Sequence, residues 1–309
     1  MTQRLFKRGA RVIVTKANPD EFFEDVVASK DGGTLNFSLS NQITVENLRV
    51  AFSIERTLTK DPNTASISIY NLSEDTRSAM QTRPLRVRLD VGYDGNLARI
   101  FDGDVRWAEN RRDGAEWVTS FQLGDGDRSY RFSRVAISLG PGTTMLQALR
   151  KVADAMGLDV PTAAAEFSQL AKQYTSGVVL SGAGHRELSR ITDRAGLGWS
   201  VQDGRLQLLD KDGYRSEPAM TISEDTGMVG MPALGPPPDK STQPVLTVSK
   251  VIDPTRPIVP GSIIVVESKA LKHVNGTYRV NRCTHRGDTH EGDWVTEIEA
   301  VPRKAKIVA

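Results

Sequence analysis

Two histidines and two carboxylates lie within residues 285–291 (HRGDTHE), and such a cluster can bind a metal ion. Imidazole nitrogens and carboxylate oxygens are the common ligands of zinc and of other divalent cations. The spacing fits no zinc motif, however, and the sequence shows no further ligand cluster. We therefore favour a solvated hairpin loop, and we interpret the Arg-Gly-Asp triplet inside it as a turn sequence rather than an adhesion motif.

Two pairs of aspartates could take part in acid–base chemistry or in ion binding. Asp102 and Asp104 flank one glycine, and Asp125 and Asp127 flank another. Paired carboxylates are the usual general acid and base of hydrolases, and they also bind calcium. Asp-Gly is also among the commonest turn-forming pairs. We therefore expect a turn or a bulge at both places.

Two glycine-bearing segments resemble catalytic or phosphate-binding loops only superficially. Residues 140–144 (GPGTT) precede a helical pattern but lack the lysine of a phosphate-binding loop, so they predict a helix cap. Residues 181–185 (SGAGH) lack the G-x-S-x-G framing of a nucleophilic serine. We therefore assign no catalytic, cofactor-binding or metal-binding residue to this chain, and we expect no cofactor.

Arginines are numerous on neighbouring predicted strands. They could line a lumen or face an acidic neighbour, although such a run more often marks one solvated face of a sheet. The arginines concerned are Arg86, Arg88, Arg99, Arg106, Arg111 and Arg112.

The composition is that of an ordinary folded protein and excludes several classes. The 40 lysines and arginines nearly balance the 38 aspartates and glutamates, and this charge is too small to argue for nucleic-acid binding. No apolar run approaches the roughly 20 residues that a membrane helix needs, and the N-terminal apolar stretch is too short for a secretory signal. The single cysteine, Cys283, excludes an internal disulfide framework, fits folding in a reducing cytoplasm and is expected to be buried.

Alternating apolar and polar residues predict a first β region. Residues 48–55 and 65–70 each have the period of two that is typical of half-buried strands, and Ser73 is expected to cap a short helix. Hairpin-linked strands with one inserted helix predict an antiparallel barrel or sandwich. We assign residues 1–135 to this domain as a first β-barrel. Its other strands are predicted at residues 11–15, 35–39, 85–91, 99–109 and 117–123.

The pattern then changes to helices and short strands. Apolar residues at helical spacing follow residue 144 until Gly157, and a second helix is predicted at residues 185–195. A hairpin around Asp203-Gly204 completes a small α+β domain, which we assign to residues 136–212. Residues 213–244 are rich in glycine and proline and are predicted to be a linker, with an exposed extended stretch at 232–244.

Residues 245–309 return to β structure and are predicted to form a second β-barrel. Its strands are expected at residues 245–249, 263–266, 277–285 and 294–301. Residues 116–119 (EWVT) and 293–296 (DWVT) open the last strand of each β region, and each follows a glycine-bearing turn. We interpret this as a duplication. The predicted fold is therefore mainly β, with two tube-type antiparallel barrels and a middle α+β domain.

The order of these motifs resembles that of phage tail hub (baseplate hub) proteins, and of the hub part of type VI secretion spike proteins. The resemblance covers most of residues 48–301, and the proline-rich stretch at 232–244 departs from it. The motifs that carry it are residues 52–54 (FSI), 62–73 (PNTASISIYNLS), 188–191 (LSRI), 196–199 (GLGW), 204–208 (GRLQL), 226–232 (TGMVGMP), 253–254 (DP), 260–264 (PGSII), 275–280 (NGTYRV), 285–288 (HRGD) and 294–298 (WVTEI).

The resemblance implies a structural protein of the virion that is not an enzyme. It implies a homotrimer whose six similar barrels form a pseudo-sixfold ring, joining the tail tube to the central spike around the DNA channel. The implied partners are the tail tube or tube-initiator protein, the spike, baseplate wedge components and the tape-measure protein, with the genome passing through unspecifically. The resemblance also implies that the protein assembles in the host cytoplasm and resides in the tail baseplate. The alternatives are a tail-associated peptidoglycan hydrolase, which would use an aspartate pair, and a glycan-binding module centred on the middle domain.

Overall fold

The computed structural model describes residues 7–16, 42–81, 85–93, 95–236, 243–253 and 255–303. The strand predicted at residues 35–39, and part of the proline-rich stretch at 232–244, lie outside these ranges. The described chain is mainly β with few helices, as the sequence predicts. Its contacts divide it into two compact units, of which the larger contains both β regions. The predicted domain boundaries, after residues 135, 212 and 244, stay predictions.

The strands of the first β region follow the predicted alternation closely. In β3 the residues Val50, Phe52 and Ile54 point into the core, and the intervening side chains do not. Ser73 caps α1 (Glu74–Ala79) through a hydrogen bond from the Thr76 amide, which confirms the predicted cap. The strands are β1 (Arg8–Lys16), β2 (Gln42–Glu46), β3 (Val50–Thr57), β4 (Thr64–Tyr70), β5 (Leu85–Tyr93), β6 (Asn96–Asp113) and β7 (Glu116–Gly124).

The second β region contains two strands that the sequence did not predict. Residues 213–244 were expected to be a linker, yet β12 and β13 lie within them, because pairing with other strands orders a segment that has no regular alternation of its own. The strands are β12 (Met220–Ser223), β13 (Met228–Gly235), β14 (Val245–Val251), β15 (Ile263–Glu267), β16 (Gly276–Asp288) and β17 (Trp294–Pro302), with 3-10 turns η3 (Glu224–Thr226) and η4 (Lys272–Val274).

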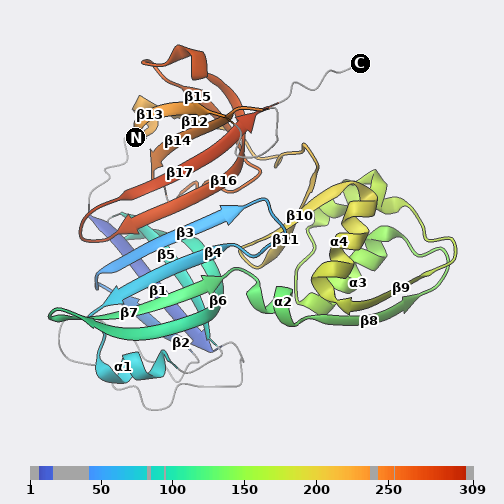
Figure 1. The fold of residues 1–309 in the computed structure, drawn as a ribbon, viewed down its shortest axis with the longest axis horizontal. Helices are drawn as coiled ribbons and strands as arrows, with labels where there is room; N and C mark the ends of the chain where they lie inside the picture. The colour runs from blue at the N-terminus through green and yellow to red at the C-terminus, as the bar shows by residue number, and fades with distance from the viewer. Residues whose placement is uncertain are drawn as a thin grey trace. The chain divides into compact units, whose positions relative to one another are not determined.

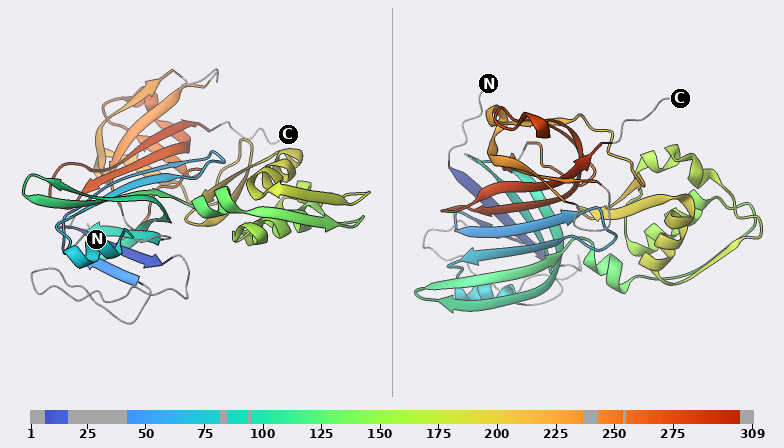
Figure 2. Two further views of the ribbon diagram at one scale, coloured as in Figure 1. Left: turned by 60° about the horizontal axis from the view of Figure 1, so that its bottom comes forward. Right: turned by 45° about the horizontal axis from the view of Figure 1, so that its top comes forward.

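The two β regions form one continuous sheet (Figure 1). Its strands follow the order β13-β14-β17-β16-β3-β4-β7-β6-β5-β1-β2, while β15 pairs with β16 and β12 with β15. The link between the regions is the pair β3 and β16, which lie side by side in both views of Figure 2. The described strands do not close into a barrel, so the two-barrel architecture stays a prediction.

The same strand order occurs twice within this sheet. The first region has the order β3-β4-β7-β6-β5, and the second has β13-β14-β17-β16-β15. The outermost neighbour differs, because β1 runs antiparallel to β5 whereas β12 runs parallel to β15. The tryptophans of the two matched motifs also differ, since Trp117 is exposed and Trp294 is buried. The predicted sequence repeat therefore corresponds to a repeated arrangement of five strands.

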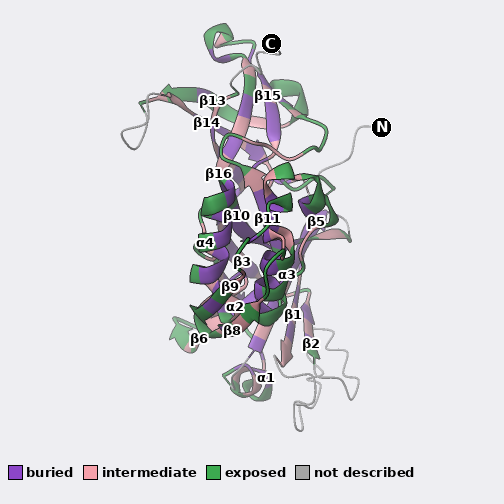
Figure 3. Ribbon diagram, turned by 90° about the vertical axis from the view of Figure 1, so that its right-hand side faces the viewer, coloured by how far each residue is buried: buried purple, intermediate pink, exposed green. Residues whose placement is uncertain are grey.

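The smaller unit consists of residues Leu58–Asn63 and Gly124–Tyr214 and has its own apolar core. Thr144 and Gln147 form a capping box at the start of α3, and Gly157 takes the left-handed conformation at its end, as predicted. Both α3 and α4 carry buried residues along one side (Figure 3). The elements are α2 (Asp127–Phe132), β8 (Arg134–Leu139), α3 (Met145–Met156), η1 (Thr162–Glu166), η2 (Ser168–Ala171), β9 (Val178–Ala183), α4 (Gly184–Ala195), β10 (Leu197–Gln202) and β11 (Arg205–Asp210).

No side chain fits at Gly287 of β16. A Cβ atom at this position would lie 2.4 Å from Phe52 of β3 and 2.8 Å from Trp294 of β17. The two aromatic rings meet edge to face, with centroids 5.5 Å apart. Glycine is therefore required here because the rings fill the space that a side chain would need.

Gly287→Ala is expected to lower the free energy of unfolding by about 1–3 kcal/mol, because the added methyl group overpacks the aromatic pair. Chemical denaturation with tryptophan fluorescence measures the change. Gly198→Ala, also within a strand, is the control, because its Cβ would be 3.8 Å from the nearest atom. Equal stability of the two variants would contradict this account of the packing.

Candidate functional site

The junction between β3 and β16 is the candidate site, because it joins the two halves of the sheet. The strands pair antiparallel from Arg282 opposite Thr57 to Asp288 opposite Ala51. The Arg282 guanidinium bridges the two halves, lying 3.1 Å from Glu55 and 3.3 Å from Glu299. Backbone pairing and ion pairs therefore act together along this line.

The end of the junction nearest the β16–β17 turn is held by Arg49. Its guanidinium donates hydrogen bonds of 3.1 and 2.8 Å to Asp288 and lies 3.0 Å from Glu291. Burial acts to raise the pKa of Asp288, but hydrogen bonds from Arg49 and from the His290 amide outweigh it and lower that pKa. Thr289 exchanges two further hydrogen bonds with the Val50 backbone.

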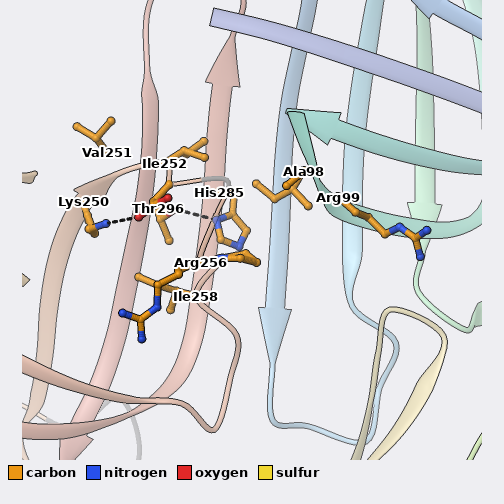
Figure 4. Close-up of a pocket in the computed structure, with 12 residues that line it drawn as sticks. Ala98, Arg99, Lys250, Val251, Ile252, Arg256, Ile258, His285 and Thr296 are labelled. Atoms are coloured by element: carbon orange, nitrogen blue, oxygen red, sulfur yellow. Dashed lines mark hydrogen bonds and ion pairs between the residues drawn. The ribbon is translucent and has the colours of Figure 1, made fainter. Parts of the chain in front are cut away.

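His285 lies in the interior of the junction and not in a loop. The turn predicted at residues 286–288 is therefore wrong, since β16 continues to Asp288 and the exposed turn follows it. Nδ1 of His285 shares a 2.8 Å hydrogen bond with the Thr296 hydroxyl (Figure 4). Burial, together with the positive charge of Arg56, lowers the pKa of His285 to about 3. The imidazole is therefore neutral at physiological pH.

Cys283 is buried beside this histidine, as the sequence predicts. Its thiol donates a hydrogen bond of 3.3 Å to the Ile258 carbonyl and lies 3.7 Å from Nε2 of His285. The cavity next to them is only about 10 Å³, which is the volume of roughly one water molecule. Lys250 and Asp253, 3.5 Å apart, line the same cavity. This space is too small for a substrate.

A wider concavity of about 610 Å³ opens on the other side of β3 and β16. It is shallow, and most of the residues that line it are polar. They lie in or just before β3, in β4, at the end of β16 and in the turn that follows it. Its lining includes Arg49, Ser53, Ser66, Ser68, Arg286 and Asp288.

The two histidines and two carboxylates that were considered as metal ligands do not converge. His285 is buried, while His290 and Glu291 lie in the exposed turn and Asp288 is engaged by Arg49. Among the residues that the structure describes, no three histidine, cysteine, aspartate or glutamate side chains are grouped to hold a metal ion.

Asp102, Asp125 and Asp127 each have a partner within the chain. Asp104 is buried within β6. Asp102 lies within β6, 2.6 Å from Arg86 and 3.4 Å from Arg99, so no turn forms there. The nearest bulge is at Ile100, where the register between β5 and β6 shifts. Arg86 and Arg99 therefore meet a carboxylate of the same chain. Arg88 likewise lies 2.7 Å from Asp90.

Asp125 stands at a turn, as predicted, and it also fixes a second turn. Its carboxylate accepts hydrogen bonds of 2.6 and 2.7 Å from the amides of Asp203 and Gly204, both at positive φ. Asp127, in the first turn of α2, forms an ion pair of 3.0 Å with Arg131. The pair therefore shapes the smaller unit and does not present two free carboxylates.

The remaining two segments also have structural roles. Residues 140–144 lead into the Thr144 cap of α3, as expected. Residues 181–185 span the end of β9 and the start of α4, where the His185 ring stacks on Tyr130 with centroids 4.3 Å apart.

A match to the family described as baseplate hub gp41 covers residues 32–297. The chain belongs to this family. The predicted resemblance to phage tail hub proteins is thereby confirmed, and the chain has a structural role in the phage tail baseplate. No curated protein sequence matches it significantly. Within the described residues, no helix is both long enough and apolar enough to span a membrane.

Two tail proteins and one type VI secretion component of known structure have a fold similar to that of this baseplate hub family member. The 43 kDa tail protein of prophage MuSo2 from Shewanella oneidensis is 8% identical with a TM-score of 0.59, covering 84% of this chain and 96% of that one. A tail protein from Neisseria meningitidis is 12% identical with a TM-score of 0.55, covering 82% and 96%. The c3393 protein of E. coli, a type VI secretion component, is 10% identical with a TM-score of 0.52, covering 89% and 76%.

Sequence reasoning missed the β3–β16 junction and the contact of Arg49 with Asp288. The available signal was Gly287, since a glycine inside a strand often marks a close approach of another group.

The buried neutral His285 should make stability depend on pH. The pKa of His285 is about 3 in the folded chain, whereas an unfolded histidine has a pKa of about 6.5. The unfolded chain therefore binds this proton first, and stability falls as the pH drops from about 6.5 towards 3. Between pH 6.5 and 4.5 the loss from this group is on the order of 2–3 kcal/mol.

His285→Gln should remove that part of the pH dependence, which urea unfolding at a series of pH values measures. His290→Gln, in the exposed turn, should keep the wild-type dependence. If the His285→Gln profile kept the wild-type slope between pH 6.5 and 4.5, the role given to His285 would be wrong.

Proposed function

We propose that this chain is the structural hub of a phage tail baseplate and that it acts as a homotrimer. The observation that supports this most is the strand order that occurs twice in one chain, as β3-β4-β7-β6-β5 and β13-β14-β17-β16-β15. Three copies of a chain with two similar halves present six similar modules in a threefold assembly. Such a ring can receive a sixfold tube on one face and a threefold spike on the other.

The two similar halves are proposed to be two tube-type barrels, with the middle α+β domain between them in the sequence. The ring would bind the tail tube or tube-initiator protein and the spike, and it would contact baseplate wedge components and the tape-measure protein. The hub would assemble in the host cytoplasm and stay in the virion. Its role is to make contacts, and no catalytic step is assigned to it.

The polar face around the concavity is proposed to line the DNA channel. On this face the charges of β16 are balanced, because Arg286 lies 3.4 Å from Glu297 and Arg282 lies between Glu55 and Glu299. Serines of β3 and β4 cover the neighbouring area. A face with paired charges and hydroxyl groups attracts DNA phosphates weakly, which suits a genome that must pass without binding.

Mass photometry of the purified chain is expected to show a species of three times the 33.9 kDa chain mass. Because the hub would lie between tube and spike, mixing with the tube and spike proteins of the same tail should retain this trimer in a larger complex. Size-exclusion chromatography with light scattering provides the independent measurement. A strict monomer, even with both partner proteins present, would argue decisively against the proposed hub.

A further inference from the structure

The two equivalent long strands of the repeat, β6 and β16, differ in what covers one of their edges. On this edge of β16, β15 covers Gly276–Arg279 and β3 covers Arg282–Asp288. On the corresponding edge of β6, β5 covers only Asn96–Asp104. No described strand continues along the edge from Ala108 to Asp113. Among the described residues, the part of β6 that corresponds to the junction in β16 is therefore a strand edge that pairs with no strand.

The equivalent of β3 in the second half is β13, and no described strand pairs with its outer edge either. Gly235 pairs with the first residue of β14, just as Glu55 pairs with the first residue of β4. Residues 233–235 therefore occupy the positions that residues 53–55 have in β3. In β3 these residues also pair with β16, but β13 ends the described sheet.

The side chains of β13 are unusual for an edge strand that faces water. The strand carries no charged residue, and the exposed fractions of Met231 and Leu234 are 72% and 43%. Natural sheets protect an open edge with charged residues, prolines or bulges, because an unprotected edge readily pairs with another chain. Pro232 and the register shift between Val229 and Ala233 leave the end from Ala233 to Gly235 as the regular part.

We propose that β13 of one copy pairs antiparallel with the Ala108–Asp113 edge of β6 in a second copy. This contact between chains would repeat the β3–β16 junction found within the chain. It would be a head-to-tail contact, and three such contacts, alternating with three internal junctions, close a threefold ring. The inference rests on the homotrimer of the proposed function and names the strands that build it.

Cysteine crosslinking between the two edges tests this pairing directly. Ala233→Cys is combined, one at a time, with a cysteine at Glu109, Arg111 or Asp113, which are exposed and lie on one face of β6. Residues opposite each other in paired strands bring their Cα atoms within disulfide range. Mild oxidation should give covalent dimers and trimers on a non-reducing gel for at least one of these pairs. The wild-type chain is the control, because its only cysteine is buried.

Ala233→Cys with Thr44→Cys, on the β2 edge at the other end of the sheet, is the matched control and should give no covalent oligomer. If light scattering shows a trimer but none of the three β6 pairs links, or if the β2 pair links instead, the strand assignment is overturned while the hub remains. If the chain is a monomer throughout, both the strand assignment and the trimer are overturned.

A charge on the open edge provides a second test without cysteines. Leu234→Lys should raise the concentration at which the trimer half-dissociates by at least tenfold, because the ammonium group would be buried against a neighbouring strand. Val179→Lys is the control, because Val179 is an exposed apolar residue of β9 in the smaller unit. Thermal unfolding of both variants shows whether each chain still folds. An unchanged dissociation of folded Leu234→Lys would overturn the proposed edge.

Discussion

The antiparallel pairing of β3 with β16 is the constraint on which the rest of the larger unit depends. It joins strands that are more than 200 residues apart in the sequence. Bringing such distant strands together costs chain entropy, and the burial of apolar side chains at the junction must offset that cost. The core of the first half includes Ile252 and Trp294 from the second half. The first half therefore does not complete its packing alone, although it has the strand order of a separate module.

Apolar and polar contacts follow one another in a fixed order along the junction. At one end, Arg49 binds Asp288 and fixes the turn after β16. Next to this end, Phe52 and Trp294 pack over Gly287, where only glycine fits. Further along, the buried His285 and Thr296 satisfy each other's hydrogen bonds. Each buried polar group needs its partner in one position, so this arrangement favours a single register of the two strands.

Local features of the fold were predictable because local residues determine them. The strands β3 and β4 follow from alternation, the helix caps at Ser73 and Thr144 follow from side-chain chemistry, and Gly157 follows from its tolerance of positive φ. The buried position of Cys283 was also expected. The duplicated order of strands was indicated only by the two short motifs at the start of β7 and β17.

The pairing of distant elements could not be predicted, because each strand satisfies its own alternation whatever its neighbour is. Residues 285–288 have the composition of a turn, yet packing of distant aromatic rings makes them part of β16. β13 lacks a regular alternation and contains a proline, so its sequence indicated a linker. The two aspartate pairs were ambiguous for the same reason, since Asp125 acquires its partners only when residues 203–204 fold beside it.

Hydrogen exchange followed by mass spectrometry tests most directly whether β3 and β16 make the two halves one cooperative unit. Amides of β3, β4, β16 and β17 should open together, with one free energy and one dependence on denaturant, because Ile252 and Trp294 of the second half complete the core of the first. If the backbone amides from residue 245 onward exchanged at low denaturant while those of residues 42–123 stayed protected, this account would be contradicted.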